Sequence, residues 1–463
     1  MLKKNQEFEG IVEKVKFPDK GIVIVDGIRV ELKGTIVGQK VLGRVNKKRR
    51  NKCQGRLLEV LEKAHNEVDP FCQYFGPEKC GGCALQNLSH ADQLIRKENQ
   101  VKELFEEANI TGHIWKDIKA SPETYAYRNK MEFSFGDEYK EGPLALGMHK
   151  KGGRFDIITV DGCHIVDSDF SKILRHVLDY CTQAGLTFYH KMSHIGYLRY
   201  LVVRKSKTTG EILINLVTST QVPYNWSEMV EQLVNLELLG KISGFIHTTS
   251  DNVADAVKPE GVELLFGKDF ITEEILGLKF KISPYSFFQT NTLGSEVLYN
   301  TVIEMARDID KKTVFDLYSG TGTIAQIMSS AAKEVYGIEI VEEAVEAAVE
   351  NAKLNELDNC HFIAGDVLKK IDELKGKPDL IILDPPREGI HPKAIGKIID
   401  FGAPEIVYVS CKPSSLVRDL QVMIEGGYVV KEVQCVDMFV HTHHVETVVR
   451  IEWNSVDTKG SGL

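Results

Sequence analysis

Hydrophobic and polar positions follow three successive patterns along the chain. Over residues 6–60, short apolar runs such as GIVIVDGIRVEL are separated by turns rich in Gly and Asp. Short strands at this spacing predict a small OB-like β-barrel. The pattern turns helical from about residue 88, and β-like runs such as LRYLVVRK and EILINLVT dominate residues 125–280. Their alternation predicts a mainly antiparallel sheet with a few helices.

In the last third, strand-like runs alternate with helical segments. TVFDLYSG, EVYGIEI, HFIAGDV, DLIILDPP and EIVYVSC are predicted strands with helices between them. This alternation indicates a parallel, doubly wound α/β sheet of Rossmann type, and the last two runs, YVVKEVQCVDMF and ETVVRIEW, predict a closing hairpin. We therefore expect three domains, at 1–63, 64–285 and 286–455. Residues 90–120 should pack on the last domain, and 456–463 should be a disordered tail.

Charge is unevenly distributed along the chain. The net charge is −9, yet residues 1–60 hold 15 Lys and Arg against 7 Asp and Glu. A basic barrel on an acidic body is typical of an appended RNA-binding module, although the run KKRRNK also suits an ordinary solvated surface. No apolar run is as long as a membrane span, and the N-terminus lacks the apolar stretch of a signal peptide. We expect a monomeric, cytoplasmic protein.

The turn after the first strand of the last domain predicts a nucleotide site. FDLYSGTGTIA places Gly320 and Gly322 before a helix, where the backbone can approach a ligand closely. Glu339 ends the second strand and is placed to accept hydrogen bonds from two ribose hydroxyls. These features suit NAD and S-adenosylmethionine equally. Asp366, after the third strand, is placed to meet an adenine edge and favours S-adenosylmethionine.

The fourth strand ends in Asp384-Pro385-Pro386-Arg387. Ligands bind at the carboxyl ends of strands in open α/β sheets. Two consecutive prolines form a rigid lip that can hold a flat base, because each fixes φ and removes a backbone donor. An acidic residue followed by Pro-Pro resembles the motif of methyltransferases that act on planar nitrogens. A plain turn after a strand is the alternative interpretation.

The next strand ends at Cys411, beside the same edge. A cysteine beside a bound flat base suggests that its thiolate attacks a pyrimidine ring. When a thiolate adds to carbon 6 of uracil, carbon 5 becomes nucleophilic enough to accept a methyl group. A base must then remove the carbon 5 proton, and Glu446, at the start of the last strand, is the candidate. Taken singly, Cys411 suits a buried apolar residue and Glu446 an exposed strand-start carboxylate.

Seven motifs together resemble the RNA (uracil-5-)-methyltransferase family: SPYSFFQTN, DLYSGTG, GIE, GDV, DPPREG, SCKP and HTHHVE. The barrel resembles a TRAM domain, and its combination with a cysteine cluster resembles the bacterial members that act on 23S ribosomal RNA. The resemblance implies a Rossmann-like methyltransferase domain with Cys411 as nucleophile and Glu446 as general base. It also implies that Gln289, Tyr318, Glu339 and Asp384 contact S-adenosylmethionine.

Three other functions remain open at this point: the same chemistry on tRNA, an NAD-dependent oxidoreductase, and a non-catalytic RNA-binding protein. The oxidoreductase would share the glycine loop, and the RNA-binding protein would share the barrel. Neither has a use for Asp384 and Cys411 together with Glu446.

Cys72, Cys80 and Cys83 are clustered in a C-x7-C-x2-C pattern, and Cys163 is the candidate fourth ligand. Four thiolates suit zinc or an iron–sulfur cluster equally well. The resembling family carries a [4Fe-4S] cluster on such residues, usually with a shorter first spacing. A structural or RNA-shaping role is expected for it.

Three neighbouring histidines, His441, His443 and His444, precede Glu446. Their place in a loop favours active-site or RNA contacts over a metal site, and solvated side chains are the alternative. The remaining cysteines suit ordinary packing.

Overall fold

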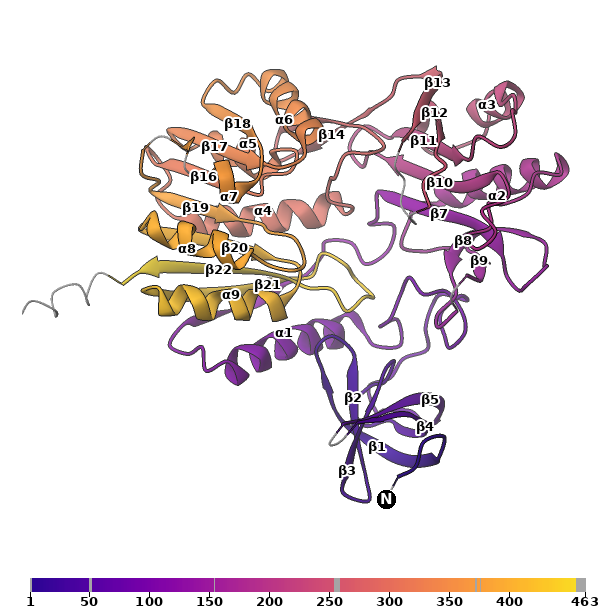
Figure 1. Ribbon diagram of the computed structural model, residues 1–463, viewed down its shortest axis with the longest axis horizontal. Helices are drawn as coiled ribbons and strands as arrows, with labels where there is room; N and C mark the ends of the chain where they lie inside the picture. Colours follow the sequence, from indigo (N-terminus) through magenta and orange to yellow (C-terminus); the bar gives the residue numbers. More distant parts are fainter. Residues whose placement is uncertain are drawn as a thin grey trace, which may run out of the picture.

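The computed structural model describes residues 2–49, 52–153, 155–253, 259–370, 373–374 and 376–454. A small barrel lies at one end, and two larger parts lie side by side beyond it (Figure 1). The tail expected at 456–463 lies outside the described residues. Among the helices described, none is long and apolar enough to cross a membrane.

The predicted N-terminal barrel is present and closed, with strand order β1-β2-β3-β5-β4. Alternate side chains point inward along its strands, and valines fill much of the interior together with Phe8, Leu32 and Cys53. The buried valines are Val12, Val15, Val23, Val30, Val41 and Val45. The strands are β1 (Glu7–Lys16), β2 (Lys20–Val25), β3 (Ile28–Leu32), β4 (Lys40–Arg49) and β5 (Lys52–Glu62).

Helix α1 (His90–Glu107) lies between the barrel and the sheet of the last third (Figure 1). Ser89 caps it by accepting a hydrogen bond from the backbone N–H of Asp92. On the barrel side, Gln100 donates to the backbone oxygen of Val15 at 2.9 Å. Lys14 is within 2.7 Å of Glu103. The helix therefore anchors the barrel to the rest of the molecule.

The central part is a seven-stranded sheet of order β13-β12-β11-β10-β7-β8-β9. Its strands are antiparallel, as predicted, except that β11 and β12 run parallel because α3 crosses between them. The elements are β7 (Lys130–Asp137), β8 (Leu144–His149), β9 (Ile157–Thr159), α2 (Ser168–Gln183), β10 (Leu198–Lys205), β11 (Glu211–Thr218), α3 (Ser227–Val234), β12 (Lys241–Thr249) and β13 (Gly261–Gly267).

The last third forms an eight-stranded sheet of order β18-β17-β16-β19-β20-β22-β21-β6. Strands β16 to β20 run parallel, and β22 inserts antiparallel between β20 and β21, as the predicted hairpin requires. The strands are β6 (Ile114–Lys119), β16 (Thr313–Leu317), β17 (Glu334–Glu339), β18 (Cys360–Ala364), β19 (Leu380–Leu383), β20 (Glu405–Ser410), β21 (Tyr428–Val436) and β22 (Glu446–Trp453).

Helices cover both faces of this sheet (Figure 1). They are α4 (Thr292–Ala306), α5 (Thr323–Ser329), α6 (Glu342–Leu354), α7 (Val367–Lys370), α8 (Pro392–Asp400) and α9 (Pro413–Glu425). A separate hairpin, β14 (Ile271–Ile275) with β15 (Leu278–Ile282), packs its buried isoleucines into the core under α4. Strand β6 reaches the sheet edge from the segment before the central part and pairs parallel with β21.

A buried polar clamp fixes residues 437–445, the loop that leads into β22. Lys97 of α1 is 1 % exposed and places its ammonium 2.6 Å from Asp437, which is fully buried. The same ammonium donates to the backbone oxygen of Phe439 at 3.0 Å. Gln93, one turn earlier on α1, accepts from the backbone N–H of His441 at 2.9 Å. The loop is therefore held at three points by one helix.

Replacing Lys97 by Ala should lower the free energy of unfolding by about 3 kcal/mol, because Asp437 would keep a buried charge with less compensation. Lys102→Ala on the same helix removes a partly exposed pair with Glu98 and should cost about 1 kcal/mol or less. Thermal and denaturant unfolding of both variants measures the difference. Equal losses would contradict the clamp.

Candidate active site

Two cavities meet in the cleft above the strand ends. One, the strand-end cavity, has a volume of about 1330 Å³ and lies over the carboxyl ends of the parallel strands. The other, the barrel-side cavity, has a volume of about 1320 Å³ and is lined by the barrel, α1 and the cysteine cluster. Both are lined by Thr290, Arg387, Cys411 and Phe439. Cys411 therefore lies where the two spaces join.

All seven residues predicted for catalysis and for S-adenosylmethionine line the strand-end cavity. They come from separate strand ends and loops, which the parallel sheet brings to one edge. The residues are Gln289, Tyr318, Glu339, Asp366, Asp384, Cys411 and Glu446.

The glycine turn forms the floor of the strand-end cavity. Gly322 has φ +73°, and a Cβ there would lie 2.5 Å from the ring of Phe362, so no larger residue fits. Tyr318, at the end of β16, also has a positive φ of 70°, an unusual conformation that bulky residues adopt mainly at functional sites. Gly320 donates its backbone N–H to Glu339 at 3.0 Å, which orients that carboxylate across the strand ends.

Three carboxylates lie at this edge: the buried Asp316 within β16, the partly buried Asp384 directly after β19 and the buried Glu446 at the start of β22. Burial raises the pKa of Asp384 to about 7. Burial, together with the Asp384 charge, raises the pKa of Glu446 to about 8 and that of Asp316 to about 8. Such raised pKa values arise where a site lacks compensating positive charge, and they are typical of functional sites.

The thiol of Cys411 follows a strand that is wholly buried. Ile406 to Val409 are 0 % exposed, and α9 begins immediately after the cysteine, with Pro413 in its first turn. Burial above all, together with the carboxylates of Glu446 and Asp384, raises the pKa of the Cys411 thiol to about 11, although Arg387 acts to lower it. In the free protein the thiol is therefore protonated at neutral pH.

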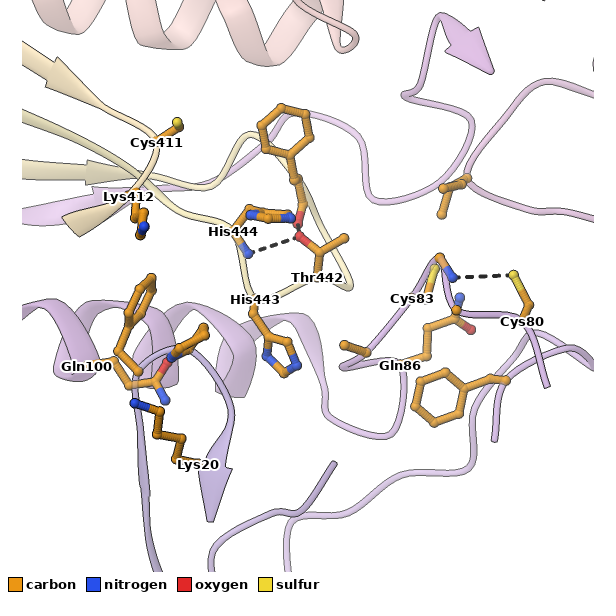
Figure 2. Close-up of a pocket in the computed structure, with 18 of the residues that line it drawn as sticks. Lys20, Cys80, Cys83, Gln86, Gln100, Cys411, Lys412, Thr442, His443 and His444 are labelled. Atoms are coloured by element: carbon orange, nitrogen blue, oxygen red, sulfur yellow. Dashed lines mark hydrogen bonds between the residues drawn. The ribbon is translucent and has the colours of Figure 1, made fainter. Parts of the chain in front are cut away.

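The barrel-side cavity joins Cys411 to the cysteine cluster. In Figure 2, Cys411 and Lys412 lie at one end, Cys80 and Cys83 lie at the other, and the loop with Thr442, His443 and His444 lies between them. Lys20 of the barrel and Gln100 of α1 complete the lower side of this view. The cavity is thus a passage shared by all three parts of the molecule.

The three histidines of this loop have different environments. His443 and His444 line the barrel-side cavity, in keeping with the predicted active-site or RNA contacts. His441 is 4 % exposed and lines neither cavity. Its backbone N–H donates to Gln93, and its burial shows that the alternative of a solvated side chain is wrong for this residue.

The four cysteines of the predicted cluster all line the barrel-side cavity, and none forms a disulfide. Burial raises the pKa of the Cys83 thiol, and the nearby thiols of Cys163, Cys80 and Cys72 raise it as well. Gly82 donates its backbone N–H to the sulfur of Cys80 at 3.4 Å, and such donors favour thiolates. Within the described residues, however, no group of His, Cys, Asp or Glu is arranged to hold a metal ion.

Residues 89–453 match the model of the tRNA (Uracil-5-)-methyltransferase family. This chain belongs to that family. It is 49% identical over 448 residues to an "uncharacterized RNA methyltransferase" of Clostridium tetani, covering 97% of this chain and 98% of the relative. A similarly described protein of Clostridium acetobutylicum is 51% identical, with coverage of 98% and 99%. The chain is an RNA methyltransferase, as the motifs predicted.

A solved structure supports the architecture. The tRNA (uracil-54, C5)-methyltransferase of Pyrococcus abyssi, in complex with S-adenosyl-L-homocysteine, superposes with a TM-score of 0.76 at 24% identity. The match covers 96% of this chain and 100% of the other. At this identity the likeness concerns the fold. Membership of the family excludes the oxidoreductase and the non-catalytic RNA-binding protein that the glycine loop and barrel left open.

Two site residues of this methyltransferase were not predicted from the sequence. Arg387 was quoted within the Pro-Pro motif but given no role, although it lines both cavities and acts on the Cys411 thiol. Asp316 lines the strand-end cavity from inside β16. An acidic residue in the middle of an otherwise apolar strand, as in TVFDL, was the signal that could have identified it.

The buried carboxylates should make the free methyltransferase less stable as the pH rises. Glu446 keeps its proton up to about pH 8 when folded but releases it near pH 4.5 when unfolded. The stability that this proton contributes is present below about pH 4.5 and is lost as the pH rises towards 8. Calorimetric melting without ligand should show a falling melting temperature over this range.

The free energy of unfolding should fall less steeply with pH in Glu446→Gln than in the wild type. The difference should be about 1.4 kcal/mol per pH unit over the range where residue 446 of the wild type is ionised in the unfolded state but not in the folded state. Glu425→Gln, at an exposed position on α9, is the matched control and should melt like the wild type. Parallel pH profiles for Glu446→Gln and the wild type would contradict the raised pKa.

Proposed function

We propose that this enzyme transfers a methyl group from S-adenosylmethionine to carbon 5 of a uridine in RNA, with Cys411 as nucleophile and Glu446 as general base. The observation that carries the proposal is the position of Cys411 at the junction of the two cavities. One cavity has the residues expected for the cofactor, and the other opens towards the barrel. A thiol at the junction can reach a base that is flipped out of the RNA strand.

Cys411 first releases its thiol proton to solvent in the cleft, and its sulfur, now a thiolate, adds to carbon 6 of uracil. A carbon–sulfur bond forms, the double bond between carbons 5 and 6 breaks, and its electron pair is delocalised onto carbon 5 and oxygen 4. S-adenosylmethionine supplies the methyl group to carbon 5 and leaves as S-adenosylhomocysteine. Arg387 favours the thiolate, since its positive charge and its hydrogen bond lower the pKa of Cys411.

Glu446 completes the reaction by removing the proton from carbon 5. The electron pair of that bond restores the enolate, which expels the Cys411 thiolate and reforms the double bond between carbons 5 and 6. Glu446 must be ionised for this step. Burial raises the pKa values of Asp384 and Glu446 in the free protein, and a sulfonium bound in the strand-end cavity would favour their charged forms and lower those values.

The remaining strand-end residues suit the other parts of S-adenosylmethionine. Glu339 is oriented to accept hydrogen bonds from the ribose hydroxyls, because the backbone N–H groups of Gly320 and Val341 hold its two oxygens. Asp366 lies at the next strand end for the adenine. We assign Gln289, Tyr318 and Asp384 to the methionine half and the sulfonium.

We propose ribosomal RNA of the large subunit as the substrate. The barrel and the cysteine cluster both border the cavity that leads to Cys411, and this combination resembles the family members that act on 23S RNA. The P. abyssi enzyme with the same fold acts on tRNA, which makes tRNA the competing substrate.

Cys72, Cys80, Cys83 and Cys163 suit a [4Fe-4S] cluster in their chemistry. They are four free thiols on one cavity wall, and a backbone donor already serves one sulfur. Such a cluster would cross-link the loop at 72–83 to residue 163 and stiffen the wall that faces the RNA. The catalytic steps above do not pass through it.

Cys411→Ala should abolish methylation of uridine, because no other group at the junction can add to carbon 6. With RNA that contains 5-fluorouridine, the wild type should form a covalent adduct, since fluorine at carbon 5 cannot be removed as a proton. Mass spectrometry of the protein measures the adduct. Full turnover by Cys411→Ala would reject the mechanism.

Glu446→Gln is the companion variant to Cys411→Ala. It keeps the thiol, so it should form a covalent protein–RNA species on ordinary RNA and fail to release it. A denaturing gel detects this species. Free RNA and free protein only, in the presence of S-adenosylmethionine, would count against Glu446 as the base.

Cells that lack this gene should lose 5-methyluridine from large-subunit ribosomal RNA and keep it in tRNA. Mass-spectrometric mapping of both RNA classes, with Cys411→Ala and wild-type genes supplied in parallel, measures the outcome. If 5-methyluridine were lost from tRNA alone, tRNA would be the substrate in place of ribosomal RNA, and the proposed chemistry would still stand.

A further inference from the structure

Three cationic side chains gather where the central sheet faces the loop at 283–291. Lys130 of β7 and Arg204 of β10 are directly opposite each other on neighbouring antiparallel strands, so their side chains share one face of the sheet. Arg128 precedes β7 and donates its Nε to the backbone oxygen of Lys130 at 3.0 Å. Arg204 is 3 % exposed, and Arg128 and Lys130 are half-buried.

These cations lack acidic partners. Among the described residues, no carboxylate lies within ion-pairing distance of Arg128, Lys130 or Arg204. Arg204 donates one terminal N–H to the backbone oxygen of Ser286, while its buried Nε has no hydrogen-bond partner. The exposed Glu132, two positions along the same strand, raises the pKa of Lys130. Burial, then Arg204, and also Arg128 lower the pKa of Lys130 to about 8.

The next residue on the same strand shows how this protein usually compensates a buried cation. Lys205 points to the opposite face of β10 and lies 2.7 Å from Asp167 and 2.8 Å from Asp169. Clustered cations that are partly desolvated and unpaired destabilise a folded protein by several kcal/mol. Such an arrangement is retained where an anionic ligand supplies the missing charge.

One member of the cluster, Arg128, reaches the catalytic cleft, whereas Lys130 and Arg204 line neither cavity. Arg128 lines the barrel-side cavity, together with Thr290, which also lines the strand-end cavity. Asn129, between two of the cations, donates to the backbone oxygen of Gln289 at 3.1 Å. Arg204 holds the same loop at Ser286. An anion held here would therefore lie next to the place where a base reaches Cys411.

We propose that Arg128 and Lys130, with Arg204 buried opposite Lys130, form a phosphate-binding site that holds the RNA backbone next to the target nucleotide. A guanidinium group matches phosphate oxygens geometrically, and one ammonium adds a compact charge. The chain is an RNA methyltransferase, so RNA phosphate is the anion that enters the cavity lined by Arg128. That the nucleotide next to this phosphate is the methylated uridine rests on the proposed function.

The test is the salt dependence of RNA binding by full-length Lys130→Gln. With a fluorescein-labelled oligouridine strand and no S-adenosylmethionine, fluorescence anisotropy should show binding weakened about tenfold. The slope of log affinity against log salt should fall by about 0.7, the value for one phosphate contact on a single strand. Lys140→Gln, at a 92% exposed lysine in the turn after β7, should leave both quantities unchanged.

Thermal unfolding without RNA separates ligand binding from a purely structural role. Removing an uncompensated cation should raise the melting temperature of Lys130→Gln above that of the wild type, whereas a structural lysine would lower it. An unchanged salt slope or a lowered melting temperature would overturn the phosphate site. Because binding is measured without the methyl donor, absence of uridine methylation by the wild type would reject the proposed function and leave this result standing.

Discussion

Burial of negative charge behind Cys411 is the constraint on which the site depends. Asp316, Asp384 and Glu446 come from three different strands and line one cavity, and among the described residues no buried cation is paired with them. In the central sheet, the half-buried Lys130 and the buried Arg204 form the reverse case, since no described carboxylate lies within ion-pairing distance of either. The free enzyme is thus prepared for a cationic donor on one side and a polyanion on the other. Cys411 lies between them.

The fold holds this arrangement through contacts that are distant in sequence. Lys97 and Asp437 join α1 to the loop that positions Glu446, and Gln100 joins the same helix to the barrel. Asp19, in the β1–β2 turn, lies 3.4 Å from His443 of that loop. The barrel is therefore in contact with the loop that leads to Glu446, the proposed general base. RNA held by the barrel would lie against the wall that contains His443.

The sequence alone was enough to predict the features that follow from short local patterns and from the order of motifs along the chain. The barrel follows from short alternating runs, and the site at the strand ends follows from the succession of Gly320, Glu339, Asp384 and Cys411, because parallel strands bring their carboxyl ends to one edge. Glu446 joins them since its strand inserts beside β20.

Other features depend on pairings between distant parts of the chain, which periodicity does not report. The Lys97–Asp437 pair spans 340 positions, and a lysine within an amphipathic helix usually indicates an exposed face. Arg204 interrupts an apolar strand, but only the register of β10 against β7 shows that it lies opposite Lys130. The separation of His441 from His443 and His444 likewise depends on the position of α1.

Release of tritium from RNA labelled at carbon 5 of uridine tests the central claim most directly. Covalent addition of Cys411, methyl transfer and proton removal by Glu446 together replace the hydrogen at carbon 5, so tritium should appear in water in a one-to-one ratio with the methyl groups transferred. The release should require both S-adenosylmethionine and Cys411. Methyl transfer to the RNA with all of the tritium retained would contradict the account.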